Sequence, residues 1–270
     1  MRRIISYAAL LCATVVSAIS CSLFSYDNYK GPEETLKGQV VDREGNPVLT
    51  DQASEGIRVR LVETSWEGNV TPQDFLCMPD GTFQNTKLFE ADYNVRVDGP
   101  FVPIVLEDPD GEVIEDRSVN LHLKGTQELT FEVDPFLSVE LLDASISNGK
   151  ITAKVRVNRG ISRSALSDVM EQTGDWQDTY ANITDVQLFV GYSSFMGYCN
   201  RDERWSNKLE YSGNAFDANL GKVIDISSIG MIPSGRKVFI RAAARINYDT
   251  PRGSGTRRWN YSEVMEVNVP

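Results

Sequence analysis

Short runs of alternating hydrophobic and polar residues recur along most of the chain, and residues that favour turns separate them. Segments 57–62, 93–97 and 150–157 all alternate in this way. A period of two places one face of an extended strand in a core and the other face in solvent. The pattern therefore predicts an all-β protein, and strands this short and this frequent favour a sandwich architecture.

The strands fall into two groups. In the first half of the chain we expect strands at 36–42, 57–62, 93–97, 119–123 and 129–133. In the second half we expect them at 138–142, 150–157, 183–192, 223–226, 237–246 and 264–269. The dipeptide Asn148-Gly149 joins two of these strands as a tight hairpin. Only Ser164 to Thr173 resembles a helix, which Gly174 ends. The prediction is two β-sandwich domains, over residues 36–135 and 136–270.

The first 20 residues have the composition of a bacterial signal peptide. Two arginines precede an uncharged apolar stretch, which is shorter than the roughly 20 apolar residues of a membrane-spanning helix. Ala18 and Ser20 then precede Cys21, in a pattern that resembles a lipobox, although leucine is usual at the place of Ala18. We expect a signal peptide at 1–20, lipidation of Cys21 and a lipidated tether at 21–35. Ordinary secretion with a free Cys21 thiol is the alternative.

Charge and histidine content narrow the function classes. The chain has 38 acidic and 27 basic residues and a net charge of -11. Because phosphate contacts need Lys and Arg, this balance argues against nucleic acid as a partner. The one histidine, His122, excludes His-rich zinc sites, so we expect no cofactor and no structural metal. Carboxylates between Asp108 and Asp116 allow a calcium hypothesis, but Asp110-Gly111 is equally an ordinary hairpin turn.

Two cysteines, Cys77 and Cys199, remain beside Cys12 of the signal and Cys21. An exported compartment permits a disulfide bridge between them, whereas their positions in different predicted domains argue against one. Both states remain open at this point.

Aromatic side chains in the long connections of the second domain are the candidate ligand-binding groups. Connections 158–182 and 247–261 are expected to share one end of the sandwich, where Tyr248 would also lie. The apolar face of a sugar ring can stack on an exposed aromatic ring while polar neighbours bond its hydroxyl groups. The candidate residues are Trp176, Tyr180, Tyr198, Trp205, Trp259 and Arg258. The alternative is that these rings cover the ends of the core. Trp66 is expected to be structural.

Acidic and basic residues are unevenly divided. Residues 22–136 hold 23 acidic and 9 basic side chains, whereas residues 137–270 hold 15 and 16. A series of arginines between Arg236 and Arg258 invites an anionic ligand, such as a uronic or sulfated glycan. A solvated strand face, or a surface docked on the acidic first domain, explains the same arginines.

Two sequence motifs resemble known modules. Residues Gly38, Asp42, Gly45 and Pro47, followed by Asp80-Gly81-x-Phe83, are similar to the transthyretin-like regulatory domain of carboxypeptidases and many surface proteins. Segment 224–244 resembles the E-to-F region of a fibronectin type III or immunoglobulin-like sandwich. The resemblance implies a transthyretin-like domain followed by a fibronectin III-like domain.

The combination of these features resembles a Bacteroidetes lipoprotein family of unknown function. The resemblance rests on the lipobox, Tyr26-Asp27-Asn28-Tyr29, the Asp80 motif and Asn260-Tyr261-Ser262. Members of that family accompany SusC/SusD-type import pairs. The resemblance implies a lipid-anchored protein of the bacterial outer membrane in a polysaccharide-utilisation system. The cell surface is the expected side, and the periplasmic side is the alternative. The resemblance implies no activity, because fold and neighbourhood are weak guides to chemistry.

Three functions are compatible with the sequence. The first is non-catalytic glycan binding through loop aromatics. The second is a scaffolding role beside a SusC/SusD-type complex, without a glycan site of its own. The third is a carboxylate-dependent glycan hydrolase. Exposed coplanar indoles favour the first, buried tryptophans favour the second, and two carboxylates converging in a deep cleft favour the third.

Overall fold

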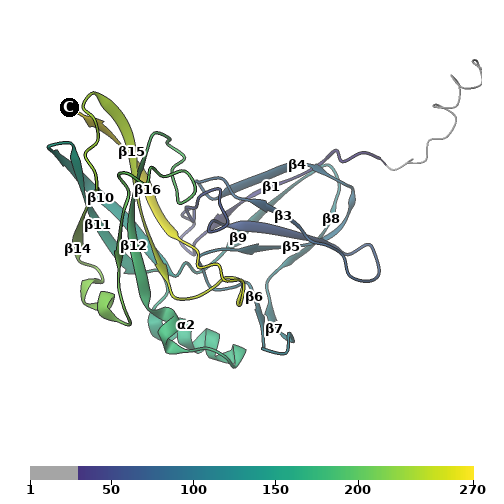
Figure 1. Ribbon diagram of the computed structural model, residues 1–270. Helices are drawn as coiled ribbons and strands as arrows, with labels where there is room; N and C mark the ends of the chain where they lie inside the picture. The colour runs from purple at the N-terminus through teal and green to yellow at the C-terminus, as the bar shows by residue number, and fades with distance from the viewer. Residues whose placement is uncertain (1–29) are drawn as a thin grey trace, which may run out of the picture.

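A computed structural model describes residues 30–270 of the chain. The predicted signal peptide at 1–20 and lipidation of Cys21 lie outside the described residues, as does most of the predicted tether. The described residues form two β-sandwiches arranged end to end (Figure 1). The predicted all-β sandwich class is confirmed.

The first sandwich contains two sheets. One sheet consists, in order, of β4 (Thr82–Leu88), β1 (Glu34–Val41) and β9 (Thr126–Glu132). The other consists of β3 (Gln73–Leu76), β2 (Arg58–Glu63), β5 (Ala91–Asp98) and β8 (Val119–Leu123). Alternate residues of both sheets, such as Leu36, Val95 and Phe131, enter one shared core. Strands β1 and β9 pair in parallel, and the other neighbours are antiparallel.

A hairpin outside both sheets interrupts the connection from β5 to β8. It consists of β6 (Val105–Glu107) and β7 (Val113–Asp116). Oδ1 of Asp108 accepts hydrogen bonds from the backbone N–H groups of Asp110 and Glu112, each at a distance of 2.9 Å. Gly111 has a φ of 86°, which glycine adopts without a steric penalty. Asp110-Gly111 is therefore the hairpin turn, and the described residues contain no group of three or more carboxylate, His or Cys side chains that could hold a metal ion.

The second sandwich also contains seven strands. One sheet consists, in order, of β10 (Leu137–Ser147), β11 (Lys150–Arg159) and β14 (Val223–Ser227). The other consists of β13 (Asn207–Glu210), β12 (Ile183–Gly191), β15 (Arg236–Ile246) and β16 (Asn260–Val269). Side chains of both sheets, such as Val155, Leu188 and Ala242, pack into one shared core. Because β11 and β12 belong to opposite sheets, the connection 158–182 crosses one end of the sandwich.

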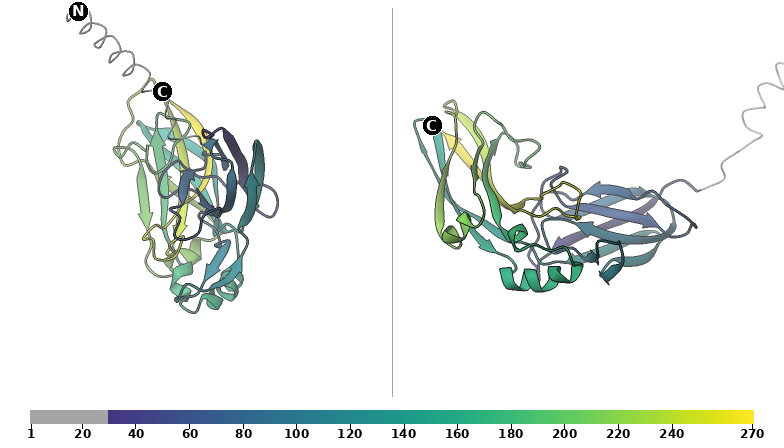
Figure 2. Two further views of the ribbon diagram at one scale, coloured as in Figure 1. Left: turned by 90° about the vertical axis from the view of Figure 1, so that its right-hand side faces the viewer. Right: turned by 60° about the horizontal axis from the view of Figure 1, so that its bottom comes forward.

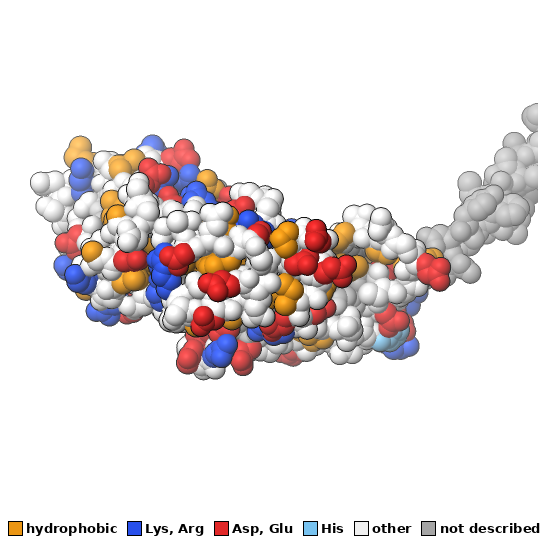
Figure 3. All heavy atoms as spheres, turned by 90° about the horizontal axis from the view of Figure 1, so that it is seen from below, with side chains coloured by type: hydrophobic (Ala, Val, Ile, Leu, Met, Phe, Trp, Pro, Cys, Tyr) orange, Lys and Arg blue, Asp and Glu red, His pale blue; other side chains and the backbone are white. Residues whose placement is uncertain are grey.

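That connection contains helix α2 (Arg163–Met170) and two 3₁₀ turns, η1 (Glu171–Thr173) and η2 (Asp178–Ala181). A third turn, η3 (Ala215–Asn219), precedes β14. Helix α2 and the β6–β7 hairpin lie on the same side of the molecule (Figures 1 and 2). Acidic side chains gather over the middle of this face, with a few basic ones among them (Figure 3). No helix among the described residues has the length and apolar character needed to cross a membrane.

Two arginines of the second sandwich are buried at the junction with the first. Arg241 on β15 is 1% exposed and donates to the carbonyl oxygens of Thr50 (2.6 Å) and Met196 (3.1 Å). Arg258 donates to the carbonyl oxygens of Ser54 (2.7 Å) and Gly56. A buried guanidinium is tolerated only when its donors find acceptors. These bonds attach the loop around residues 50–56 of the first sandwich to the second sandwich. Arg241 and Arg258 therefore hold the two domains together.

Apolar and acidic groups complete the junction. Phe189, Trp259 and Tyr261 form a separate buried cluster there. Asp51 is fully buried beside them, and its Oδ2 accepts the backbone N–H of Tyr198 over 2.8 Å. Burial raises the pKa of Asp51, although the Tyr261 hydroxyl and the Tyr198 N–H act in the opposite direction. The junction is a packed interface with fixed polar contacts.

Candidate functional site

Two of the predicted tryptophans are buried. Trp259 is 0% exposed at the domain junction, where the guanidinium of Arg245 lies 4.3 Å from its ring centre. Trp205 is 4% exposed and packs edge-on against Tyr192 at a centroid distance of 5.4 Å. The expectation of exposed stacking rings is therefore wrong for Trp205 and Trp259, because each fills a packing site beneath other side chains.

Arg258 and Tyr198 belong to the junction as well. The guanidinium of Arg258 donates its hydrogen bonds to backbone carbonyl groups, and Arg258 is only 5% exposed. Tyr198 is half-buried, stacks on Trp259 and lies under Arg201, whose guanidinium is 4.2 Å from its ring centre. Neither residue presents a free face for a sugar.

Trp176 and Tyr180 do come together at one end of the second sandwich. Their ring centroids are 5.6 Å apart, and Tyr248 lies 5.4 Å from Trp176 and 5.9 Å from Tyr180. The connections 158–182 and 247–261 thus meet at one end, as expected. Nε1 of Trp176 donates to Oγ of Ser167 on α2 over 3.2 Å, which holds the indole against the helix.

Arg252 adds a cation to this aromatic cluster. Its guanidinium lies 4.7 Å from the ring centre of Tyr180 and 5.9 Å from that of Tyr248. It also forms an ion pair with Asp175, at 2.9 Å. Burial raises the pKa of Tyr248 to about 12, so its phenol stays protonated at neutral pH. The cluster therefore offers aromatic edges, a hydroxyl group and an Arg–Asp pair side by side.

A cleft of about 400 Å³ opens beside this cluster, between the two sandwiches. Both domains contribute to its walls, which include Arg96, Asp98, Glu107, Asp175, Tyr248 and Arg252. This volume lies within the range of ~300 to 1,000 Å³ that is usual for small-molecule sites. A second hollow, of about 350 Å³, adjoins Tyr180 and Arg257 and shares Tyr248 and Arg252 with the first. Together they outline an open groove around the end of the second sandwich.

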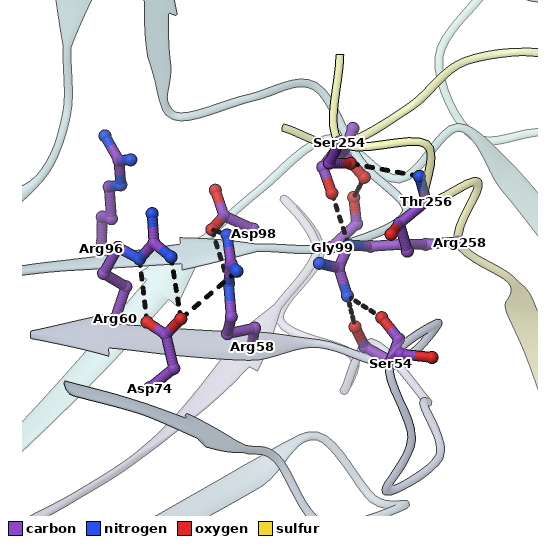
Figure 4. A network of polar contacts seen from close by, with 12 residues as sticks. Ser54, Arg58, Arg60, Asp74, Arg96, Asp98, Gly99, Ser254, Thr256 and Arg258 are labelled. Atoms are coloured by element: carbon purple, nitrogen blue, oxygen red, sulfur yellow. Dashed lines mark hydrogen bonds and ion pairs between the residues drawn. The ribbon is translucent and has the colours of Figure 1, made fainter. Parts of the chain in front are cut away.

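The wall formed by the first sandwich consists of Arg96 and Asp98 on β5 and of segment 103–111, which includes the β6–β7 turn. Beside this wall, β2, β3 and β5 carry a network of charged side chains (Figure 4). Arg58 bonds Asp98 over 2.6 Å, and Arg60 bonds Asp74 over 2.8 Å. The hydrogen bond from Arg60 lowers the pKa of the Asp74 carboxyl group. Arg96 stands beside this network without joining it, and its closest charged partner is Glu107 at 3.8 Å.

Arg252 belongs to the arginine series noted in the sequence, whereas no local signal selected Arg96 or Asp98. Arg96 and Asp98 occupy outward positions on an alternating strand, which are usually solvated, and only the position of the second sandwich turns them into a cleft wall. Trp66, expected to be structural, is the most exposed tryptophan at 59%, and its Nε1 donates to Glu63 over 2.7 Å.

The two cysteines among residues 30–270 are free. Cys77 is buried in the first core and Cys199 is exposed. Burial raises the pKa of the Cys77 thiol to about 12. The hypothesis of a bridge between them is wrong, because Cys77 points into the interior of one domain while Cys199 lies on the surface.

Comparisons with known proteins place the chain in a family. No family model and no curated protein matches it. A solved DUF3823 family protein from Bacteroides uniformis is 57% identical with a TM-score of 0.86, and the match covers 88% of this chain and 100% of that one.

Two more distant structures share the fold. One, from Bacteroides uniformis, is described as a "putative carbohydrate binding protein", with 19% identity and a TM-score of 0.62. The other is a DUF3823 family protein from Parabacteroides merdae, with 19% identity and a TM-score of 0.58. Each match covers 88% of this chain and 100% of the other. Because of the 57% identity over the whole of the first relative, the chain belongs to the DUF3823 family.

Proposed function

We propose that the protein binds a glycan, without catalysis, in the cleft between its two sandwiches. The observation that carries this proposal is that Tyr248, packed against Trp176 and Tyr180, meets charged groups of the first sandwich at one cleft. Sugars offer apolar C–H faces and many hydroxyl groups, which match aromatic rings and paired charged side chains respectively.

The polar groups of the cleft suit hydroxyl recognition. Asp98 and Asp175 each bond an arginine, Arg58 and Arg252 respectively. A sugar hydroxyl can donate to such a carboxylate while it accepts from the neighbouring guanidinium. Because the buried contacts of Arg241 and Arg258 fix the two walls relative to each other, little order has to be created on binding.

The same pairing supports a non-catalytic role. A hydrolase needs one carboxyl group to protonate the leaving oxygen and a second to act on the anomeric carbon. Asp98 and Asp175 are engaged with arginines, and Asp108 accepts the N–H groups of its own turn. We therefore propose binding in place of hydrolysis.

We further propose that the protein is lipid-anchored through Cys21 at the outer membrane and faces the cell surface. The signal-like segment 1–20, the cysteine that follows it and the family relatives from Bacteroides support this placement. At that surface the protein would present glycan to a SusC/SusD-type import pair. Globomycin-sensitive processing and labelling of Cys21 by a fatty-acid probe test the anchor, and a Cys21→Ala variant that stays membrane-bound argues against it.

A glycan array, followed by affinity electrophoresis, tests the binding site. Parent chain and an Arg252→Ala variant are compared. Arg204→Ala is the matched control, because Arg204 also pairs with an aspartate, Asp202, and lies over an aromatic ring, Trp205, away from the cleft. We expect binding by the parent and the control, and loss in Arg252→Ala. Equal binding by all three places the site elsewhere.

One observation favours the scaffolding role as a second candidate. Tyr192 and Phe195 on one loop, and Ile229 and Met231 on another, are between 53% and 70% exposed. Trp205 touches both loops, since it packs on Tyr192 and accepts the N–H of Ile229. If no glycan binds, cross-linking to outer-membrane partners with and without Met231→Lys tests this surface.

A further inference from the structure

Arg96 is an arginine whose side chain forms no hydrogen bond within the described residues. Its Nε is buried and has no hydrogen-bond partner, and its side chain is only 24% exposed. In Figure 4 the guanidinium of Arg96 points away from the bonded network of Arg58, Arg60 and Asp74. A guanidinium carries five N–H donors, and leaving them without acceptors in a partly dry site costs stability. We therefore expect a ligand that enters the cleft to supply the acceptor for the Arg96 guanidinium.

The carboxylates near Arg96 already accept hydrogen bonds from other groups. Asp74 and Asp98 bond Arg60 and Arg58, and Asp116 accepts the backbone N–H of Ser118 over 2.7 Å. Glu107 alone faces Arg96, at 3.8 Å from Nη1, which exceeds hydrogen-bond distance. The Glu107 side chain is 49% exposed and belongs to the hairpin, so solvent weakens this contact.

Arg252, the other cation of the cleft, differs in this respect. Its charge is compensated by Asp175 at 2.9 Å, and aromatic rings hold its guanidinium. Arg252 is therefore suited to hydroxyl groups. The more weakly compensated cation of the cleft is Arg96 on the opposite wall, whose single ion pair among the described residues is the one with Glu107 at 3.8 Å.

We propose that the cleft selects glycans that carry a carboxylate, as uronic acids do, and that Arg96 binds this carboxylate. This inference rests on the proposed glycan-binding function and names its substrate class. The two terminal Nη groups of a guanidinium are spaced to meet both oxygens of a carboxylate, and at Arg96 these are the donors open to a ligand, because Nε is buried. The ligand replaces Glu107 as the counter-ion, while the sugar ring lies toward Tyr248 and Arg252.

Calorimetric titration of the mature chain tests this selectivity. The probes are oligogalacturonates, alginate oligomers and glucuronate-bearing xylan oligosaccharides, each beside its methyl-esterified or carboxyl-reduced form, which keeps the backbone and removes the charge. Neutral and sulfated oligosaccharides complete the panel. The variants are Arg96→Gln, Arg96→Lys and Glu107→Gln. Arg117→Gln is the control, since Arg117 lies nearby, pairs with Glu115 and does not line the cleft.

We expect at least one carboxylated glycan to bind, and its uncharged form to bind about 10-fold or more weakly. Arg96→Gln should lower the affinity for the charged ligand by a similar factor and leave the affinity for the uncharged form unchanged. Arg96→Lys should restore part of the affinity, Glu107→Gln should increase it, and Arg117→Gln should match the parent. Because Arg96 makes no hydrogen bond, its loss leaves the fold intact, which a circular dichroism melt checks.

The outcomes separate the two proposals. Binding of neutral glycans alone, or equal binding of charged and uncharged forms, overturns the role of Arg96 and leaves the glycan function standing. Binding that needs a sulfate in place of a carboxylate also overturns the inference. If no glycan of any class binds, both proposals fail.

Discussion

The guanidinium of Arg241 on β15 donates to the carbonyl oxygen of Thr50 over 2.6 Å, across the junction of the two sandwiches. The same side chain donates to Ser262 and Met196 on its own side. With a further bond to the carbonyl oxygen of Pro79 at 3.3 Å, one buried cation joins four chain segments across the junction of the domains. The cleft depends on that junction, because its two walls belong to different domains.

Replacement of Arg241 by Met should destabilise the protein. The variant leaves several buried carbonyl groups without donors, so we expect the free energy of unfolding to fall by about 2–4 kcal/mol. Urea unfolding followed by circular dichroism measures this loss. Arg159→Met is the comparison for domain coupling, because Arg159 donates to the carbonyl oxygen of Ala181 within the second sandwich. A loss below about 0.5 kcal/mol for Arg241→Met would show that the junction does not depend on this residue.

Asp51 should make stability depend on pH in the mildly acidic range. Its folded pKa is raised by burial, so the folded state holds the proton more tightly than the unfolded chain does. This contribution is therefore complete below the unfolded pKa and is lost as pH rises through the folded pKa. The stability difference between parent and Asp51→Asn, measured by urea unfolding from pH 4 to 7, should shift in favour of Asn as pH increases. A difference that is flat over this range contradicts the assignment.

The four tryptophans should respond differently to substitution. Trp259 is fully buried, so Trp259→Ala should cost about 3–5 kcal/mol, whereas Trp66→Ala should change stability by less than about 0.5 kcal/mol. Acrylamide quenching of the fluorescence should lose its most accessible component in Trp66→Phe. Retention of that component in Trp66→Phe would mean that another indole is exposed.

The two thiols should differ in reactivity. Cys199 is exposed and should react with a thiol reagent in the native state, while Cys77 should react only on unfolding, because burial raises its pKa to about 12 and blocks access. Mass spectrometry of Cys21-free protein counts the labels. If neither cysteine reacts in the native protein and both react only after a reductant is added, the two thiols are not free and the prediction is wrong.

Local sequence signals predicted much of the fold. Asn148-Gly149 does join β10 to β11, with φ values of 49° and 72° that suit this dipeptide. The helix expected from Ser164 appears as α2 and η1, and Gly174, at a φ of 76°, ends it. These features depend on neighbours within a few residues, which a sequence displays directly. The short edge strands β3 and β13 lack enough alternation to be predicted.

The site was only partly predictable because it depends on domain placement. The meeting of Trp176, Tyr180 and Tyr248 followed from the strand order of one sandwich. The burial of Trp259 and Arg258 did not, since loop 50–56 of the other sandwich covers them. Arg96 became a wall of the cleft for the same reason. A linear pattern shows which face of a strand is polar, but not what lies opposite that face.

The indole N–H signals of the four tryptophans test the central claim most directly. Single Trp→Phe variants assign the signals in a ¹H–¹⁵N spectrum, and the glycan found by the array is then added to the parent chain. Since Trp176 contacts Tyr248 at the cleft, we predict that its signal shifts while those of Trp66, Trp205 and Trp259 stay in place. A shift of Trp66 alone, or of none of the four at saturating glycan, would contradict a glycan site in the cleft.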